Sequence, residues 1–271
     1  QHLGPRAVRH VSAGLRRVHL DFNINPWKKK KIFDLGDVAL PHANNNERCI
    51  EDITNFYTKI ANYRKPVVSI GGDHSITGGI LQGLGSNNLE MTKGKKISFL
   101  HIDAHTDTFT QLDHFMGAKK SAAHWGAYLV DQRIIDPKTS MQIGMRGNPR
   151  SLDWLQPSYD LGYNVVTMEE FKKRGIKDVI DQTIEKIGDN PVYITFDLDS
   201  LDATVAPAVS NIEPGFTGFT IDEAKKLIQS VKNKNVIGGD VVCLMPTKDQ
   251  KNNITSMVAA SIMFEIISVI A

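Results

Sequence analysis

Short apolar runs alternate with longer amphipathic stretches along most of this chain. The runs that are typical of buried strands lie at residues 66–70, 96–103, 140–145, 164–167, 192–197 and 235–244. Just before the first of these runs, residues 47–63 have an apolar side chain at every third or fourth position, as an amphipathic helix does. Because strands that alternate with helices favour parallel pairing, the pattern predicts an α/β fold, a three-layer α/β/α arrangement with a mostly parallel sheet.

The remaining elements follow from the same pattern. Helices are expected at residues 5–17, 75–84, 127–133, 176–187 and 253–269, and a short strand at residues 32–38. Another helix is expected to start after Thr220, because Glu223 completes a capping box with it. Residues 108–124 form a long polar loop, and long loops in compact α/β domains tend to be functional.

Composition excludes several classes of protein. A chain of 271 residues can bury one sizeable core, and without repeats or linkers we expect one domain over residues 1–271. The net charge of +2 argues against a nucleic-acid surface, and the run of lysines at 28–31 is expected to be a solvated loop. No apolar stretch is long enough to cross a bilayer. Two cysteines make no disulfide framework, which fits a reducing compartment.

Three of the expected strands end in histidine or aspartate. One runs into His-Ile-Asp-Ala-His-Thr-Asp (101–107), one into Gly-Gly-Asp-His-Ser (71–75), and one into Asp-Leu-Asp-Ser-Leu-Asp (197–202). The carboxyl ends of parallel strands lie along one sheet edge, where ligands bind, so we expect these side chains to meet. Imidazole and carboxylate together suit Mn, Zn, Fe or Ni, and the pattern therefore predicts a metal site with several ligands.

These motifs resemble the signatures of the ureohydrolases, a family that includes arginase, agmatinase, guanidinobutyrase, proclavaminate amidinohydrolase and formimidoylglutamase. The similarity extends from residue 4 to the C-terminal helix, and residues 136–147 most resemble the agmatinase and guanidino-acid hydrolase branch. The resemblance implies an arginase-like fold. It also implies an enzyme that cleaves a small guanidino compound (agmatine, guanidinobutyrate or a similar guanidino acid, or guanidine) to urea and an amine.

The same resemblance implies two divalent metal ions, with manganese as the first choice and nickel as the alternative. One ion would be held by His74, Asp103, Asp107 and Asp197. The other would be held by Asp103, His105, Asp197 and Asp199. Asp103 and Asp197 would thus bridge the two ions, together with a hydroxide that attacks the guanidinium carbon. Four carboxylates among six ligands are a suitable balance for two dications.

The resemblance implies catalytic roles for His124 and Asp107. His124 lies in the long loop where the agmatinase branch has a proton-shuttling or substrate-contacting histidine, provided that the alignment is shifted by two residues. His114 is the competing candidate in that loop. His101 has no ligand role in the family and is expected to support a ligand from behind.

Substrate-binding roles are expected for Cys243 and Asp202. Cys243 stands where the family has a glutamate that pairs with the guanidinium, and a thiol cannot form that bidentate pair. Two interpretations remain open: Cys243 packs as a small apolar residue, or it marks an altered pocket or lost activity. Residues 203–211 lack the glycines of the family's substrate loop, which predicts a remodelled pocket.

The chain begins without Met at a point that in the family follows the first strand, so an N-terminal segment is expected to be missing. We expect a cytoplasmic protein, or a mitochondrial one if that segment has a transit peptide. The family implies a small guanidino substrate as partner and a homo-oligomer, a trimer or hexamer. Two alternatives remain: a metal-binding but catalytically silent homologue with a regulatory role, and a formimidoyl or acyl amidohydrolase on the same scaffold.

Overall fold

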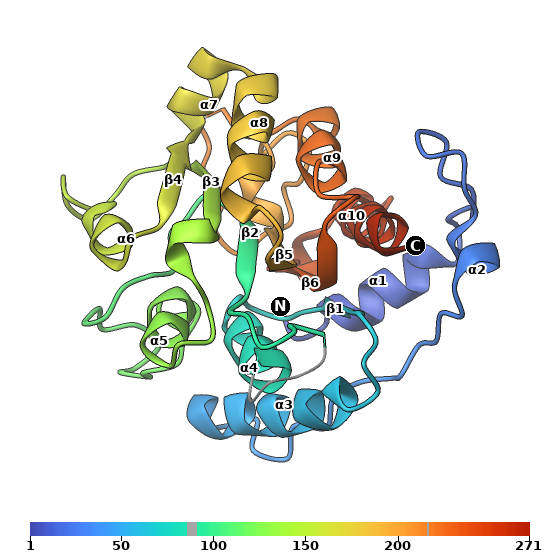
Figure 1. The fold of residues 1–271 in the computed structure, drawn as a ribbon, viewed down its shortest axis with the longest axis horizontal. Coiled ribbons are helices and arrows are strands. Elements are labelled where there is room, and N and C mark those ends of the chain that lie inside the picture. Colours follow the sequence, from blue (N-terminus) through green and yellow to red (C-terminus); the bar gives the residue numbers. More distant parts are fainter. Residues whose placement is uncertain (86–90, 216) are drawn as a thin grey trace.

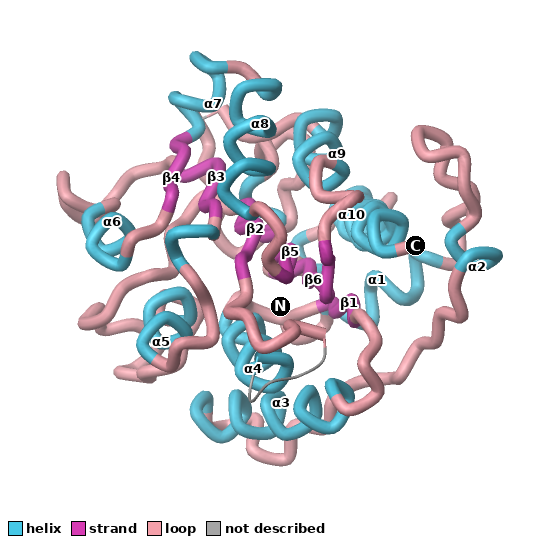
Figure 2. The backbone as a smooth tube through the Cα atoms, viewed as in Figure 1, coloured by secondary structure: helices cyan, strands magenta, loops and turns pink. Residues whose placement is uncertain are grey.

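A parallel sheet forms the centre of the molecule (Figures 1 and 2). The computed structural model describes residues 1–85, 91–215 and 217–271. In spatial order, the six strands of the sheet are β1 (Val67–Ile70), β6 (Asn235–Val242), β5 (Pro191–Asp197), β2 (Ser98–Ile102), β3 (Met141–Met145) and β4 (Asn164–Thr167). Every neighbouring pair is parallel, so all six strands direct their carboxyl ends to the same edge.

Helices cover both faces of this sheet (Figure 1). One face packs against α3 (Asn46–Ala61), α4 (Ser75–Gly85), α5 (Trp125–Asp131) and α6 (Gln156–Leu161). The other packs against α1 (Gly4–Ser12), α7 (Met168–Arg174), α8 (Ile176–Ile187), α9 (Ile221–Gln229) and α10 (Ile254–Ile270). The shorter elements are α2 (Pro26–Lys29) and the 3₁₀ turns η1 (Pro137–Thr139), η2 (Leu198–Ser200) and η3 (Pro246–Lys248). Among the described residues, no helix has both the length and the hydrophobicity that a membrane crossing demands.

The two faces follow from alternation within the strands. Phe99 and Tyr193 belong to the hydrophobic cluster under α3, α4 and α5, whereas their neighbours Leu100 and Ile194 belong to the cluster under α8, α9 and α10. Successive side chains of a strand point to opposite faces, so strands buried on both sides are apolar at every position. The three-layer α/β/α fold with a parallel sheet is therefore confirmed.

The expected strand at residues 32–38 is wrong. The chain has no regular secondary structure there, and the side chains of Phe33 and Leu35 are 75% and 64% exposed. Arg9 of α1 holds this segment through ion pairs with Asp34 and Asp37. A short apolar segment forms a strand only where a neighbouring strand hydrogen-bonds its backbone. No strand among the described residues pairs with residues 32–38. The first helix is also shorter than expected, because α1 ends at Ser12.

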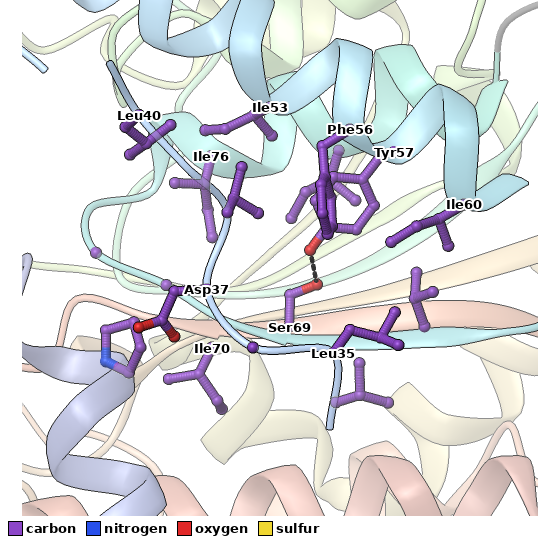
Figure 3. A pocket seen from close by; sticks show the side chains of 18 of the residues that line it. Leu35, Asp37, Leu40, Ile53, Phe56, Tyr57, Ile60, Ser69, Ile70 and Ile76 are labelled. Carbon is purple, nitrogen blue, oxygen red and sulfur yellow. Dashed lines mark hydrogen bonds between the residues drawn. The ribbon is translucent and has the colours of Figure 1, made fainter. Parts of the chain in front are cut away.

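An apolar groove separates the 32–38 segment from the sheet (Figure 3). Its walls include Leu35 of that segment, Leu40 just after it, Phe56 and Tyr57 of α3, and Ser69 of β1. The groove has a volume of about 2200 Å³, and its lining includes none of the six expected metal ligands. The candidate chemistry lies elsewhere, at the carboxyl ends of the strands.

Candidate metal centre

Histidine and aspartate side chains from three strand ends meet at one edge of the sheet. His74 follows β1 and immediately precedes α4, residues 103–107 follow β2, and Asp197 ends β5. Asp199 lies in η2, directly after β5. β2 and β5 are hydrogen-bonded neighbours, which explains why ligands nearly a hundred residues apart in sequence come together.

The first half of the site surrounds Nδ1 of His74. This atom lies 2.9 Å from Oδ2 of Asp103, 3.1 Å from Oδ2 of Asp107 and 3.3 Å from Oδ2 of Asp197. It is buried, and none of these contacts has hydrogen-bond geometry. A buried lone pair that faces three carboxylate oxygens is the arrangement that a cation would satisfy.

The second half surrounds Nδ1 of His105. This atom lies 3.4 Å from Oδ1 of Asp103 and 3.3 Å from Oδ2 of Asp199. The side chain of His105 is 31% exposed, whereas that of His74 is 2% exposed. The second half is therefore the part of the site that solvent and small molecules reach.

Asp103 connects the two halves. Its Oδ2 faces His74 and its Oδ1 faces His105, so one carboxylate has an oxygen in each half. Among the described residues, two sets have the spacing of metal ligands, and Asp103 belongs to both: His74, His101, Asp103 and Asp107 in one set, and Asp103, His105 and Asp199 in the other. This geometry and the donor types fit a pair of divalent ions.

The carboxylates dominate the electrostatics of the site. Burial by itself lowers the pKa of His74, but Asp103, Asp107 and Asp197 outweigh burial and raise that pKa well above its ordinary value. The pKa of Asp199 is raised by burial and by the neighbouring charge of Asp197. Four carboxylates held this close repel one another, and cations between them relieve that repulsion.

The backbone at the site is locally strained. Asp107 and Cys243 both adopt positive φ angles, +52° and +69°, which side chains other than glycine rarely adopt. Such conformations persist only where the surrounding structure enforces them, and they concentrate at functional sites.

The model of the family described as "Arginase family" matches residues 1–268. The chain belongs to the arginase family. The human guanidino acid hydrolase, mitochondrial, is 32% identical over 97% of this chain and 71% of its own length. The guanidinopropionase of Pseudomonas aeruginosa is 30% identical over 99% of this chain and 80% of its own length. Family membership makes the chain a ureohydrolase, a hydrolase of guanidino C–N bonds.

Solved structures agree with this arginase-family fold. The proclavaminate amidino hydrolase from Streptomyces clavuligerus superposes with a TM-score of 0.88 at 28% identity, covering 98% of this chain and 84% of that one. The formimidoylglutamase from Bacillus subtilis superposes with a TM-score of 0.86 at 20% identity, covering 98% of this chain and 80% of that one, which shows a shared fold.

The structure places His124 at the end of the long loop, where it forms the N-cap of α5. Its Nδ1 is 2.8 Å from the hydroxyl of Ser121, and its Nε2 is 2.9 Å from the carbonyl oxygen of Leu112. His114 binds the same hydroxyl through its Nδ1. Both ring nitrogens of His124 therefore hold the loop together. Its catalytic role stays a prediction that this geometry does not favour.

Cys243 and Asp202 have different surroundings. The thiol of Cys243 is buried beside Asp197, and burial raises its pKa well above the ordinary value. The carboxylate of Asp202 instead accepts hydrogen bonds from Thr204 and from the backbone of Gly218, which close the loop after β5. Cys243 thus borders the metal centre, while the substrate-binding role of Asp202 stays a prediction.

Several residues of the centre had no assigned role in the sequence pattern. Gln142 donates to Nδ1 of His101, whose Nε2 faces Oδ2 of Asp103, so His101 supports that ligand from behind. Arg146 donates to the three carbonyl groups of residues 199–201. Glu213 lies beside His105. No regular spacing connects these residues, because each contact crosses between segments that are distant in the sequence.

Proposed function

We propose that this chain hydrolyses a small guanidino compound to urea and an amine at the centre built around Asp103. The observation that carries the proposal is the placement of the two Asp103 oxygens, one in each half of the site. A single carboxylate shared between two sets of ligands suits a binuclear centre. Relatives named agmatinase and guanidinopropionase support the guanidino substrate class.

Six residues would hold two divalent ions: His74, Asp103, His105, Asp107, Asp197 and Asp199. Manganese is our first choice and nickel the alternative, since carboxylates and imidazoles suit both. When bound, the two metal ions would supply a nucleophile near neutral pH by lowering the pKa of a water molecule. Every other contribution comes from the side chains of this chain.

The side chains balance the charge of the site and orient the substrate. The carboxylates of Asp103, Asp107, Asp197 and Asp199 would offset the positive charge of two divalent ions, so that a cationic guanidinium is not repelled. The partly exposed side chain of His105 marks the side from which the substrate enters. We assign Asp107, which is fixed by a hydrogen bond from the indole of Trp125, to orienting the attacking water and accepting its proton.

The finer substrate assignment rests on the residues around Cys243. We propose agmatine, guanidinobutyrate, guanidinopropionate and free guanidine as candidate substrates.

The proposed assembly is a trimer or hexamer. We keep the cytoplasm as the proposed compartment. The mitochondrion is the alternative, since the human and chicken relatives are named as mitochondrial.

The decisive experiment is urea release from the purified protein after reconstitution with Mn²⁺ or Ni²⁺. The substrates are agmatine, guanidinobutyrate, guanidinopropionate, arginine and guanidine. We expect urea from at least one of them and none after Asp103→Asn, which removes the charge shared by both halves. The exposed α8 variant Glu185→Gln serves as the matched control and should retain full activity.

One observation favours a second function. Cys243 lies at the centre beside Asp197, and a thiol cannot pair with a guanidinium as a carboxylate does. A catalytically silent, metal-binding homologue with a regulatory role would show two bound ions per chain and no urea from any of the five substrates. That result would overturn our proposal and establish the silent homologue in its place.

A further inference from the structure

The imidazoles of His74 and His105 are each oriented by a hydrogen bond at Nε2, but the two hydrogen-bond partners differ. A histidine that binds a metal through one ring nitrogen is oriented by the partner of its other nitrogen, usually a carboxylate, a carbonyl or water. In this chain, Nδ1 of His74 and Nδ1 of His105 face the carboxylates of the site. The partners of the two Nε2 atoms therefore decide how each ring is held.

Glu213 holds His105. Its Oε1 lies 3.1 Å from Nε2 of His105, so Nε2 donates its proton to this carboxylate and leaves the lone pair of Nδ1 for the site. Glu213 lies directly over Gly147: a Cβ at this glycine would lie 2.5 Å from Oε2 of Glu213. Gly147 also has a φ of +98°, a backbone conformation that residues other than glycine rarely adopt.

A buried relay holds His74. Its Nε2 lies 2.8 Å from the hydroxyl of Thr195, which in turn donates to Oδ1 of Asp240 at 2.7 Å. Since the proton of that hydroxyl goes to Asp240, the hydroxyl oxygen accepts from His74. The other oxygen of Asp240 accepts from Thr77 and from the phenol of Tyr193. Thr195, Asp240 and Thr77 are fully buried.

The relay extends to the groove beside β1. Ser69 lies near the phenol of Tyr193, and its hydroxyl hydrogen-bonds the hydroxyl of Tyr57 at 2.6 Å (Figure 3). Ser69 and Tyr57 both line the groove. The position of His74 is thus tied to the packing of α3 on the sheet, whereas that of His105 depends on a surface loop.

We propose that Glu213 and the Thr195–Asp240 pair are positioning residues that act separately on the two halves of the centre. Glu213 fixes the ring of His105 for one ion, and Thr195 with Asp240 fixes the ring of His74 for the other. The inference rests on the proposed binuclear centre, and it extends that proposal to the affinity of each half.

The test is calorimetric titration of the metal-free protein with Mn²⁺, with no substrate present. We expect Glu213→Gln to weaken one of the two binding events by about 10- to 100-fold and to leave the other at the wild-type affinity. Thr195→Val, which removes the hydroxyl at constant shape, is expected to weaken the other event. Thr195→Ser restores a hydroxyl and should restore the affinity.

Two controls make the outcome unambiguous. Glu185→Gln should bind both ions as the wild type does, and thermal unfolding of each metal-free variant reports its fold. Equal weakening of both events by either variant, or no change in Glu213→Gln, would overturn the inference. A wild-type chain that binds two ions without releasing urea would overturn the proposed function alone, whereas one that binds fewer than two would overturn both.

Discussion

The indole nitrogen of Trp125 donates a hydrogen bond of 2.9 Å to Oδ2 of Asp107. Trp125 is fully buried at the start of α5, and Asp107 lies in the loop after β2 in a left-handed conformation. The bond therefore joins a helix on one face of the sheet to a proposed metal ligand at the edge of the sheet. Asp107 keeps its unfavourable backbone angle because a rigid donor holds its side chain.

We expect Trp125→Phe to weaken Mn²⁺ binding by on the order of tenfold, because Asp107 loses the partner that orients it. Calorimetric titration measures the change. Trp27→Phe on the partly exposed α2 is the matched control and should bind as the wild type does. An unchanged affinity in Trp125→Phe would show that the indole serves packing alone.

Arg146 supports the turn that contains Asp199. Its guanidinium donates to the carbonyl oxygens of Asp199, Ser200 and Leu201 at 2.6, 2.9 and 3.0 Å. Arg146→Met removes three hydrogen bonds to buried carbonyl oxygens, of which only that of Ser200 keeps another donor, the backbone N–H of Phe219, and we expect a loss of about 3 kcal/mol in the free energy of unfolding.

Denaturant unfolding of the metal-free protein measures this loss. The comparison variant is Arg174→Met, which breaks a solvent-exposed ion pair with Asp178 and should change stability by less than about 1 kcal/mol. Similar losses in the two variants would contradict the role of Arg146.

Asp249 caps the last helix. The side chain of Asn253, at the N-cap position of α10, makes no capping bond, and Asp249 instead accepts from the backbone of Thr255 and from the backbone and hydroxyl of Ser256. Burial raises the pKa of Asp249, but these hydrogen bonds outweigh burial, and the pKa is lowered from its ordinary value of 3.8.

We expect Asp249→Asn to cost about 1 kcal/mol in the free energy of unfolding at pH 7. Because the folded-state pKa is depressed, the contribution of the carboxylate is fully present above the unfolded-state pKa and is lost as the pH falls through the folded value. The difference between wild type and variant should thus narrow below about pH 4. Denaturant unfolding from pH 7 to pH 3 checks this, and a difference independent of pH would refute it.

The two cysteines should differ in reactivity. Cys243 is 5% exposed at the metal centre, whereas Cys49 is partly exposed and donates a hydrogen bond to the carbonyl of His42. We expect iodoacetamide to alkylate Cys49 in the native protein and Cys243 only after unfolding. Mass spectrometry of the labelled peptides reads this directly, with Cys49→Ser as the control. Labelling of native Cys243 would mean that the packing around its side chain opens to solvent.

The sequence predicts the edge of the sheet where the candidate centre lies because each ligand segment directly follows an apolar run. The strands before His74, Asp103 and Asp197 had to be buried, and parallel strands deliver their ends to one edge. The structure accordingly brings His74, Asp103, His105, Asp107, Asp197 and Asp199 together.

The supporting residues could not be predicted in the same way. Thr195 lies within an apolar run, where a threonine is an ordinary strand former, and its contact with His74 crosses 121 residues. Asp240 offered a weak signal, since an acid within an otherwise apolar strand must find buried donors. Residues 32–38 show the converse, because their apolar residues predict a strand but no strand among the described residues pairs with them.

The open edge of β1 also determines how this protein must be handled in solution. β1 pairs with β6 on one side, and on its other side no strand among the described residues pairs with it. An unpaired edge beside exposed Phe33 and Leu35 is a template for non-specific strand association. We therefore expect the highest concentration at which the protein stays monodisperse to depend on this edge and on the ion pairs of Arg9. Added metal should change that concentration little.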